Sequence, residues 1–326
     1  MKRLILTSSS GFSLTRSGLA EAVIQFAFRF VWGPYLHHSK LEAYFGVRAD
    51  QGPGDHWSDW SPWGRWSPAV RARKNLSFIE YCEIFAVIEL WFDPDPNDQL
   101  ELIFLLDFFH AHPETAAKLR LRFIAFDLLI MRPDEIPEPE DVPAVDVTTA
   151  ELETGRVSWQ AYRASTPQPC FDLLSKNLSA LPLLRPALLA LMEEIPGYRT
   201  GLGATEMRLL ELVAGRHTHP LELTHPGRLG TGIFSEIEMP LLIEGLAHGP
   251  EPALAGLERA RGMAKENHAG RHAAYMRSRL SLTELGENVL AHKEDFSRYN
   301  PIDRWWGGTH LTNNNLWRWH PALMKP

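Results

Sequence analysis

Strand-like and helix-like patterns alternate through the first 130 residues of the chain. Short apolar runs rich in β-branched or aromatic residues predict strands: RLILT, IQFAFRFVW, AVIELWF and LRLRFIAFDLLI. Helical spacing marks the segments SLTRSGLAEAV, SKLEAYFG, PAVRARKNLSFIEYCEIF and DQLELIFLLDFFHAH. Because strands that alternate with helices pair in parallel, we predict a Rossmann-like α/β domain over residues 1–130, with a parallel sheet covered by helices.

The pattern changes after residue 130. Residues 131–146, MRPDEIPEPEDVPAVD, are Pro-rich and acidic, which predicts a linker or a long surface loop. Strand patterns become rare beyond it, and helical periodicity dominates. Helix starts are marked by Thr148 or Thr149 before Glu151 and by Thr205 before Glu206. We therefore predict a second, mostly helical domain over residues 147–326 that ends in an aromatic tail.

The composition limits the classes of protein to which this chain can belong. The chain has 326 residues, 44% of them hydrophobic, which suffices for two domains with real cores. A net charge of −7 argues against a protein coated in basic patches for nucleic acid. Two cysteines, Cys82 and Cys170, cannot form a disulfide framework, and neither a signal peptide nor a membrane-spanning run stands out. We expect a cytoplasmic protein.

The stretch DPDPNDQ, residues 93–99, follows a predicted strand directly. Asp95 can cap a helix that begins at Pro96, and Asp98 can reach back to the backbone at the cap. A ligand site is the alternative, because ligands of open α/β sheets bind beyond the C-terminal ends of strands. In that case Asn97, Asp98 and Gln99 point into the crevice, with Asp98 as a general base or hydroxyl ligand and Gln99 as a hydrogen-bond orienter.

A serine-rich turn follows the first predicted strand. Ser8, Ser9, Ser10, Gly11 and Ser13 lie where backbone N–H groups and hydroxyls can cradle a phosphate or carboxylate. The turn matches neither G-x-G-x-x-G nor the P-loop, and a plain helix cap explains it about as well.

Four tryptophans, Trp57, Trp60, Trp63 and Trp66, recur every three residues in a loop with Arg65. In an extended segment their rings would share one edge and could stack on bases or sugars. The alternative, which we favour, is that the loop folds its rings onto the domain surface.

Two further groups of polar residues need an interpretation. The histidines, such as the His268 and His272 pair, lack the glutamate or cysteine partners of a zinc site, so we predict no metal. In the tail IDRWWGGTHLTNNNLWRWH, the tryptophans are expected to pin the C-terminus onto the domain. Asp303, Arg304 and His310 could instead line a pocket, so Arg304 is a candidate ligand contact.

These stretches together resemble a bacterial family, grouped as domain of unknown function 1835, with its helical C-terminal companion domain. The resemblance rests on SSSGFSL, FVWGP, IELWFDPDPNDQLELIFLLDFF, GLGATEMRLLELVAG and LSLTELGENVLAHKEDFSRYNPIDRWWGGTHL, in that order along nearly the whole chain. It implies an α/β domain followed by a winged-helix domain, with Ser8–Ser13, Asp98 and Gln99 in the shared pattern. It transfers no activity, and the Trp loop at 55–68 departs from many relatives.

The segment LSLTELGENVL resembles the run from wing to last helix in winged-helix proteins. With ATEMRLLELVAG as the first helix, a winged-helix core would span about residues 203–292. Such domains contact DNA or proteins, and Arg271, Arg277 and Arg279 are the candidate DNA contacts.

Two hypotheses about function follow. The first is a protein that binds a phosphorylated or nucleotide-like small molecule between the serine turn and residues 97–99, with group transfer or hydrolysis as the reaction if it is an enzyme. The second is a ligand-sensing regulator or an adaptor that uses the winged-helix part to bind DNA or a protein partner. No motif indicates a cofactor, and the sequence is compatible with a homodimer.

Overall fold

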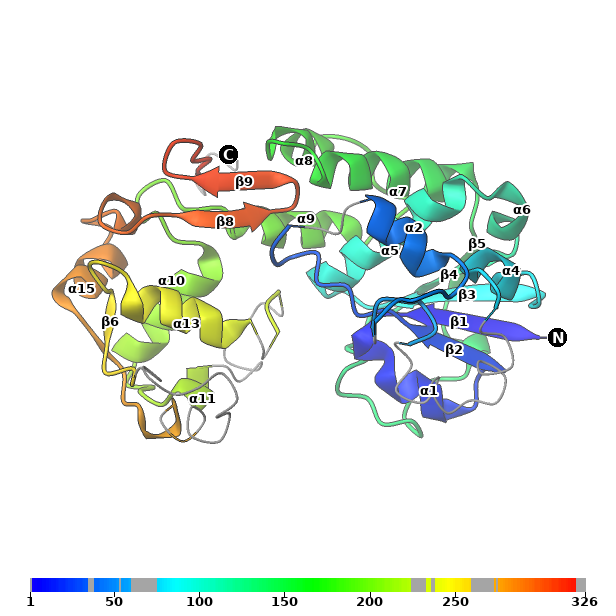
Figure 1. Ribbon diagram of the computed structural model, residues 1–326, viewed down its shortest axis with the longest axis horizontal. Coiled ribbons are helices and arrows are strands. Elements are labelled where there is room, and N and C mark those ends of the chain that lie inside the picture. The colour runs from blue at the N-terminus through cyan, green and yellow to red at the C-terminus, as the bar shows by residue number, and fades with distance from the viewer. Residues whose placement is uncertain are drawn as a thin grey trace. The chain divides into compact units, whose positions relative to one another are not determined.

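The computed structural model describes residues 2–34, 38–52, 54–59, 75–223, 233–235, 238–258, 273 and 275–320. The chain divides into two compact units (Figure 1). The first comprises Met1–Phe30, Pro34–Arg163 and Asp172–Ala187, and the second Val31–Gly33, Ala164–Phe171 and Leu188–Pro326.

The first unit is built on a five-stranded sheet with the order β2-β1-β3-β4-β5. Its strands are β1 (Arg3–Thr7), β2 (Ala22–Gln25), β3 (Val87–Phe92), β4 (Leu119–Phe123) and β5 (Ala144–Asp146). The first four strands are parallel, and β5 pairs with β4 in the antiparallel direction. This confirms the predicted α/β class with a mostly parallel sheet.

Helices cover this sheet, with α1 on one side and α5 and α7 on the other in Figure 1. The helices of the unit are η1 (Ser9–Ser13), α1 (Leu14–Ser17), α2 (His38–Phe45), α4 (Phe78–Cys82), α5 (Pro96–His110), α6 (Pro113–Ala116), η2 (Pro139–Asp141) and α7 (Thr149–Tyr162). Helices α5 and α7 approach closely at Gly155, where a Cβ atom would lie 2.4 Å from Leu106 Cβ. Helix α5 is largely apolar because it is buried between the sheet and α7.

The strand order creates a topological switch point. Strand β1 has β2 on one side and β3 on the other. The chain therefore passes from β1 to its neighbour β2 on one side, and then crosses β1 to form β3 on the other side. The chain segments that follow β1 and β3 therefore run on toward opposite edges of the sheet. In open parallel sheets this is where a crevice for ligands forms.

The predictions for residues 13–34 are wrong in part. Only Leu14–Ser17 of SLTRSGLAEAV forms an α-helix, and its end already belongs to β2. Strand β2 stops at Gln25, and the rest of IQFAFRFVW leaves the sheet because its aromatic side chains pack elsewhere. Phe28 contacts Phe104 of α5, and Phe30 contacts Trp159 of α7, with ring centroids 5.2 and 4.7 Å apart.

The Pro-rich segment 131–146, predicted as a linker or loop, supplies η2 and the edge strand β5. A buried arginine holds it: Arg122 donates to the carbonyls of Pro139 and Val142 and pairs with Glu89 at 2.6 Å. Burial alone would raise the pKa of Glu89, but bonds from Arg122 and Trp91 outweigh it and lower that pKa. The segment thus belongs to the first unit, which continues past the predicted boundary at residue 130.

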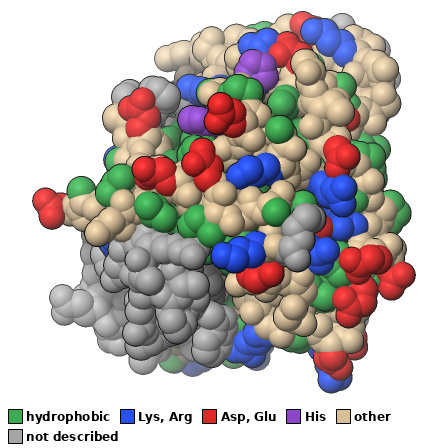
Figure 2. Space-filling view, turned by 90° about the vertical axis from the view of Figure 1, so that its right-hand side faces the viewer, with side chains coloured by type: hydrophobic (Ala, Val, Ile, Leu, Met, Phe, Trp, Pro, Cys, Tyr) green, Lys and Arg blue, Asp and Glu red, His purple; other side chains and the backbone are tan. Residues whose placement is uncertain are grey.

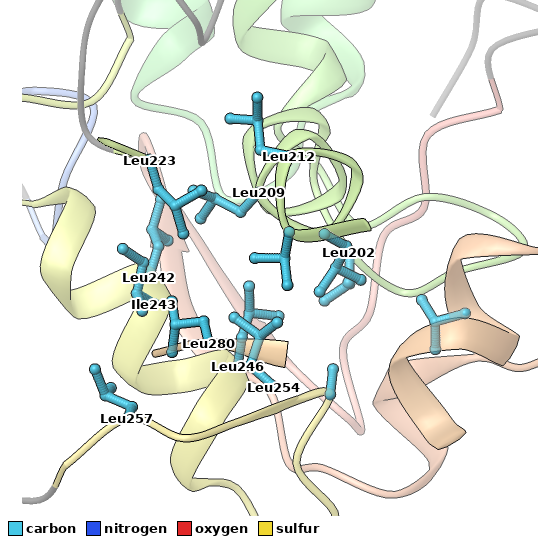
Figure 3. Close-up of a cluster of buried hydrophobic side chains, with 14 of the residues drawn as sticks. Leu202, Leu209, Leu212, Leu223, Leu242, Ile243, Leu246, Leu254, Leu257 and Leu280 are labelled. Carbon is cyan, nitrogen blue, oxygen red and sulfur yellow. The ribbon is translucent and has the colours of Figure 1, made fainter. Parts of the chain in front are cut away.

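The second unit is mainly helical. Its elements are α10 (Ala204–Ala214), α11 (Pro220–Leu223), α13 (Met239–His248), β6 (Leu254–Ala255), β7 (Ser281–Leu282), α15 (Glu284–Leu290), η3 (Phe296–Arg298), β8 (Asp303–Trp306) and β9 (Thr309–Thr312). Helices α8 (Gln168–Leu173) and α9 (Leu184–Glu193) contain residues of both units. Leucines of α10 and α13 converge on β6 and β7 in one buried core (Figure 3), as Leu209, Leu246 and Leu254 show. Among the described residues, no helix has the length and apolar character needed to span a membrane.

The aromatic tail is fixed to the second unit, as predicted. Strands β8 and β9 form a hairpin, and the indole of Trp306 donates to the carbonyl of Leu191 at 2.7 Å. The backbone of Trp319 bonds to Pro196 and Tyr198. These two buried tryptophans supply the anchoring that the tail needs.

Candidate functional site

Two turns meet at the switch point of the first unit. The hydroxyls of Ser8 and Ser10 both donate to Asp98 Oδ2 at 2.5 Å. The serine turn follows β1, and Asp98 lies in the first turn of α5, just beyond β3. The sequence predicts that these two turns lie opposite each other, and in the structure they are in direct contact.

Helix α5 begins as its sequence predicts. Asp95 is the N-cap, with Oδ1 accepting from the backbone N–H of Asn97 at 2.8 Å and of Asp98 at 3.4 Å, and Pro96 is the first helical residue. The expectation that Asp98 reaches back to the cap is wrong. Its carboxylate crosses to the serine turn, because two hydroxyl donors lie within reach there.

The serine turn is tightly built. Ser8 Oγ accepts from the backbone N–H of Ser10, and a Cβ on Gly11 would lie 2.1 Å from Thr7 Oγ1, so only glycine fits against the strand end. Ser13 donates to the carbonyl of Met131 at 2.6 Å. The hydroxyls expected to cradle an anion at Ser8, Ser10 and Ser13 are therefore engaged by the protein itself.

Asn97 and Gln99 face inward, and not into a crevice as predicted. Asn97 bridges to the Phe30 N–H at 3.0 Å and the Phe28 carbonyl at 2.8 Å, which ties the aromatic segment to α5. Gln99 donates to the carbonyl of Asp93 at 2.6 Å. Both side chains are buried, and their hydrogen bonds stabilise the turn.

Asp93 joins the site although it was not among the predicted site residues. Its Oδ1 accepts from the Asp95 N–H at 2.9 Å, and its Oδ2 accepts from the Leu128 N–H at 3.1 Å. It thereby links the turn after β3 to the segment after β4. The signal for it is an aspartate placed directly after a buried strand.

These carboxyl groups hold protons more tightly than usual. Burial raises the pKa of Asp98 well above its ordinary range; the charges of Asp93 and Asp95 add to this, and bonds from Ser10 and Ser8 offset part of it. Burial, followed by the charge of Asp93, raises the pKa of Asp95 to about 7. Near neutral pH the cluster can therefore both give and accept protons.

Glu101 extends the cluster by one turn along α5 and was not among the predicted site residues. It is fully buried, and burial followed by the charge of Asp98 raises its pKa well above the ordinary range. Oε1 accepts from the Asn97 amide at 3.2 Å, while Oε2 has no hydrogen-bond partner among the residues that the structure describes. The signal is a glutamate four residues after Asn97 on a helix that is otherwise apolar at this point.

The other candidate residues lie elsewhere. Arg304 belongs to the second unit, where its guanidinium donates to Glu206 at 2.8 Å. Arg277 pairs with Glu258 at 3.0 Å, Arg279 donates to the Ser278 carbonyl, and Arg271 lies outside the described residues.

The Trp loop is described only in part. Trp57 is buried with its ring 4.9 Å from that of Tyr81, as expected for rings folded onto the domain. Trp60, Trp63, Trp66 and Arg65 lie outside the described residues. Within the part of the chain that is described, no group of three or more His, Cys, Asp or Glu residues could hold a metal ion.

The surface seen in Figure 2 mixes charges. Acidic and basic side chains are interspersed on the coloured part of that face, and no wide basic area is visible there. This distribution suits a small ligand better than a polyanion. No protein-family model matches the chain, and a search of characterised proteins finds no match either. The family resemblance drawn from the sequence therefore stays a prediction.

Proposed function

We propose that the first unit binds a small, nucleotide-like molecule at the C-terminal ends of β1 and β3. The observation that carries this proposal is the Asp98 carboxylate, which two serine hydroxyls fix at the switch point of a parallel sheet. A carboxylate with this placement accepts hydrogen bonds from hydroxyl or amino groups, such as those of a ribose.

The part of the ligand that reaches Asp98 is not a phosphate. The serine hydroxyls of the turn already donate within the protein, and the neighbouring carboxylates repel an anion. A phosphate, where the ligand carries one, lies away from this cluster. If the protein catalyses group transfer or hydrolysis, Asp98 is the general base, since it is the carboxylate that lies between the two turns and contacts both serines.

Thermal denaturation with a panel of nucleosides, nucleotides and sugar phosphates tests this proposal. A ligand at a hundred times its Kd should raise the free energy of unfolding by about 2.7 kcal/mol. Asp98→Asn keeps an acceptor for the serine hydroxyls and should abolish the shift, whereas Asp107→Asn, farther along α5, should retain it. A panel without any shift, or an unchanged shift in Asp98→Asn, would refute the proposal.

A second candidate function rests on the second unit. Its helices α10, α11 and α13 precede the antiparallel pair β6–β7, an order that winged-helix domains share. This order supports a regulator or adaptor that contacts DNA or a protein. Fluorescence anisotropy with labelled duplex DNA should then show binding that weakens steeply with salt and weakens on Arg279→Ala. Unchanged anisotropy at low salt would remove the DNA alternative.

A further inference from the structure

The segment that follows β4 spans the switch point of the sheet. Its backbone reaches the turn after β3 at Leu128, whose N–H donates to Asp93 Oδ2 at 3.1 Å. Three residues later it reaches the serine turn after β1, where the carbonyl of Met131 accepts from the Ser13 hydroxyl at 2.6 Å. Residues 128–131 therefore join the two turns that form the proposed site.

The same segment lies close to the carboxyl group on which the proposed function rests. Asp98 is hydrogen-bonded to Asp93 as well as to the two serines. Asp93 in turn accepts from the Leu128 N–H. Two hydrogen bonds thus connect Asp98 with the backbone of this segment, so a small molecule held at Asp98 has residues 128–131 beside it.

The segment presents two adjacent apolar side chains to the outside. Leu129 is 63% exposed and Ile130 is 75% exposed, which are the highest values among the large hydrophobic side chains that the structure describes. The preceding side chain, Leu128, is buried, and the Leu129 N–H donates to Asp127 Oδ1 at 2.8 Å. Because hydrogen bonds fix the backbone both before and after the pair, its exposure is a property of the fold.

The other exposed large hydrophobic side chains in the described part of the first unit form no such pair. Phe12, in the serine turn, has the Arg16 guanidinium 5.1 Å from its ring centroid. Val47 lies alone after α2, and Val145 lies alone in β5. Single exposed apolar residues are ordinary on protein surfaces, so the adjacent pair beside the two turns is the feature that needs an explanation.

The size of this apolar pair favours a small molecule as its occupant. A specific protein interface buries about 800 Å² on each partner, which two side chains do not supply. Charged residues limit the apolar surface on both sides, since Asp127 precedes it and the exposed pair of Arg132 and Asp134 follows it. Small-ligand sites combine apolar walls with a few polar groups, and Asp98 with its two serines is the polar group nearest in the fold.

We infer that Leu129 and Ile130 contact the base of a nucleoside whose sugar is held at Asp98; this inference rests on the proposed function. A nucleoside matches both features, because its sugar supplies hydroxyl donors and its base supplies a flat, largely apolar face. A free sugar matches only the first. Neither aliphatic side chain can form a hydrogen bond, so this contact distinguishes a nucleoside from a sugar and does not distinguish one base from another.

The test compares adenosine with methyl β-D-ribofuranoside, which keeps the sugar and has a methoxy group in place of the base. Ligand-observed NMR titration of the whole chain should show adenosine binding at least about tenfold more tightly. Replacing both Leu129→Ser and Ile130→Ser should weaken adenosine binding about tenfold and leave the affinity for the riboside unchanged. Val47→Ser, the matched control at an exposed apolar position outside the two turns, should leave both affinities unchanged.

The outcomes separate this inference from the proposed function. Equal affinities for the two probes, or an adenosine affinity that the double substitution leaves unchanged, overturn the base contact. If neither probe binds but the nucleotide and sugar-phosphate panel gives a shift that depends on Asp98, the proposed site stands and the base contact falls. If the panel fails as well, both fall. A dimer in size-exclusion chromatography that the double substitution converts to a monomer would assign the apolar pair to an interface between copies, and the base contact would again fall.

Discussion

The carboxyl group of Glu194 offers a quantitative test of the electrostatics in the second unit. It is buried just beyond α9, and its Oε1 accepts from the Thr205 hydroxyl at 2.6 Å and the Thr205 N–H at 3.1 Å, at the start of α10. Burial raises the pKa of Glu194 to about 7; the bond from Thr205 and the charge of Arg304 oppose this rise, and the charge of Glu206 adds to it. The substitution Glu194→Gln removes the titration and keeps an acceptor for Thr205.

The sign of this pH effect on stability follows from comparing the pKa of Glu194 in the folded and unfolded chains. The folded pKa of about 7 exceeds the ordinary value of 4.5, so the folded protein binds the proton more tightly. Its stabilising contribution is complete below the unfolded pKa and is lost as the pH rises through the folded pKa. For this shift the loss between pH 5 and pH 8 amounts to about 2.5 kcal/mol, at about 1.36 kcal/mol per pKa unit.

Urea denaturation followed by tryptophan fluorescence at pH 5 and pH 8 measures this effect. Relative to wild type, Glu194→Gln should gain about 2.5 kcal/mol in the free energy of unfolding on going from pH 5 to pH 8. The matched control is Glu193→Gln, the same change on the exposed neighbouring residue, which should show no such trend. A wild-type-to-variant difference that stays constant within about 0.5 kcal/mol would show that Glu194 does not titrate in this range, and the reasoning would be refuted.

Two further pairs of substitutions, each with its own control, probe the packing and the ion pairs of the chain. Gly155→Ala should destabilise the first unit by about 1–3 kcal/mol in chemical denaturation, because the new methyl group meets α5. Gly245→Ala, on an exposed helix position with no neighbouring atom within 4 Å, should be neutral or stabilising by up to about 1 kcal/mol. Arg122→Leu should cost about 3–5 kcal/mol because it leaves Glu89 buried without its main partner. Arg120→Leu breaks an exposed pair on the same strand and should cost at most about 1 kcal/mol; equal losses for the two arginines would contradict the assignment.

Local chemistry made part of the site predictable from the sequence. The sequence Asp95-Pro96 specifies a capped helix start by itself. The N-cap hydrogen bonds of Asp95 and the fixed backbone angle of Pro96 both act within one helical turn and need no distant residue. The position of the two turns followed from the rule that parallel strands end at the same edge. The destination of the Asp98 carboxylate did not follow, since its donors, Ser8 and Ser10, are about 90 residues away in sequence.

Long-range contacts also explain why the segment 131–146 was misjudged. Its prolines and acidic residues are typical of a loop, and nothing within it indicates a strand. The contacts that fix it come from Arg122, whose guanidinium reaches two of its carbonyls, and from pairing with β4. Glu101 was missed for a related reason. A single glutamate in an apolar helix does not reveal whether it faces solvent or a buried polar group.

The discontinuous make-up of the first unit has a consequence for biosynthesis. The sheet and α5 are encoded by residue 146, but α7, which covers α5 at Gly155, and the segment up to Ala187 follow later. A growing chain adds about 5–20 residues per second, so the apolar surface of α5 emerges from the ribosome seconds before its cover. During that interval the nascent chain presents a binding surface for chaperones, and shortened chains that end before α7 should depend on them for solubility.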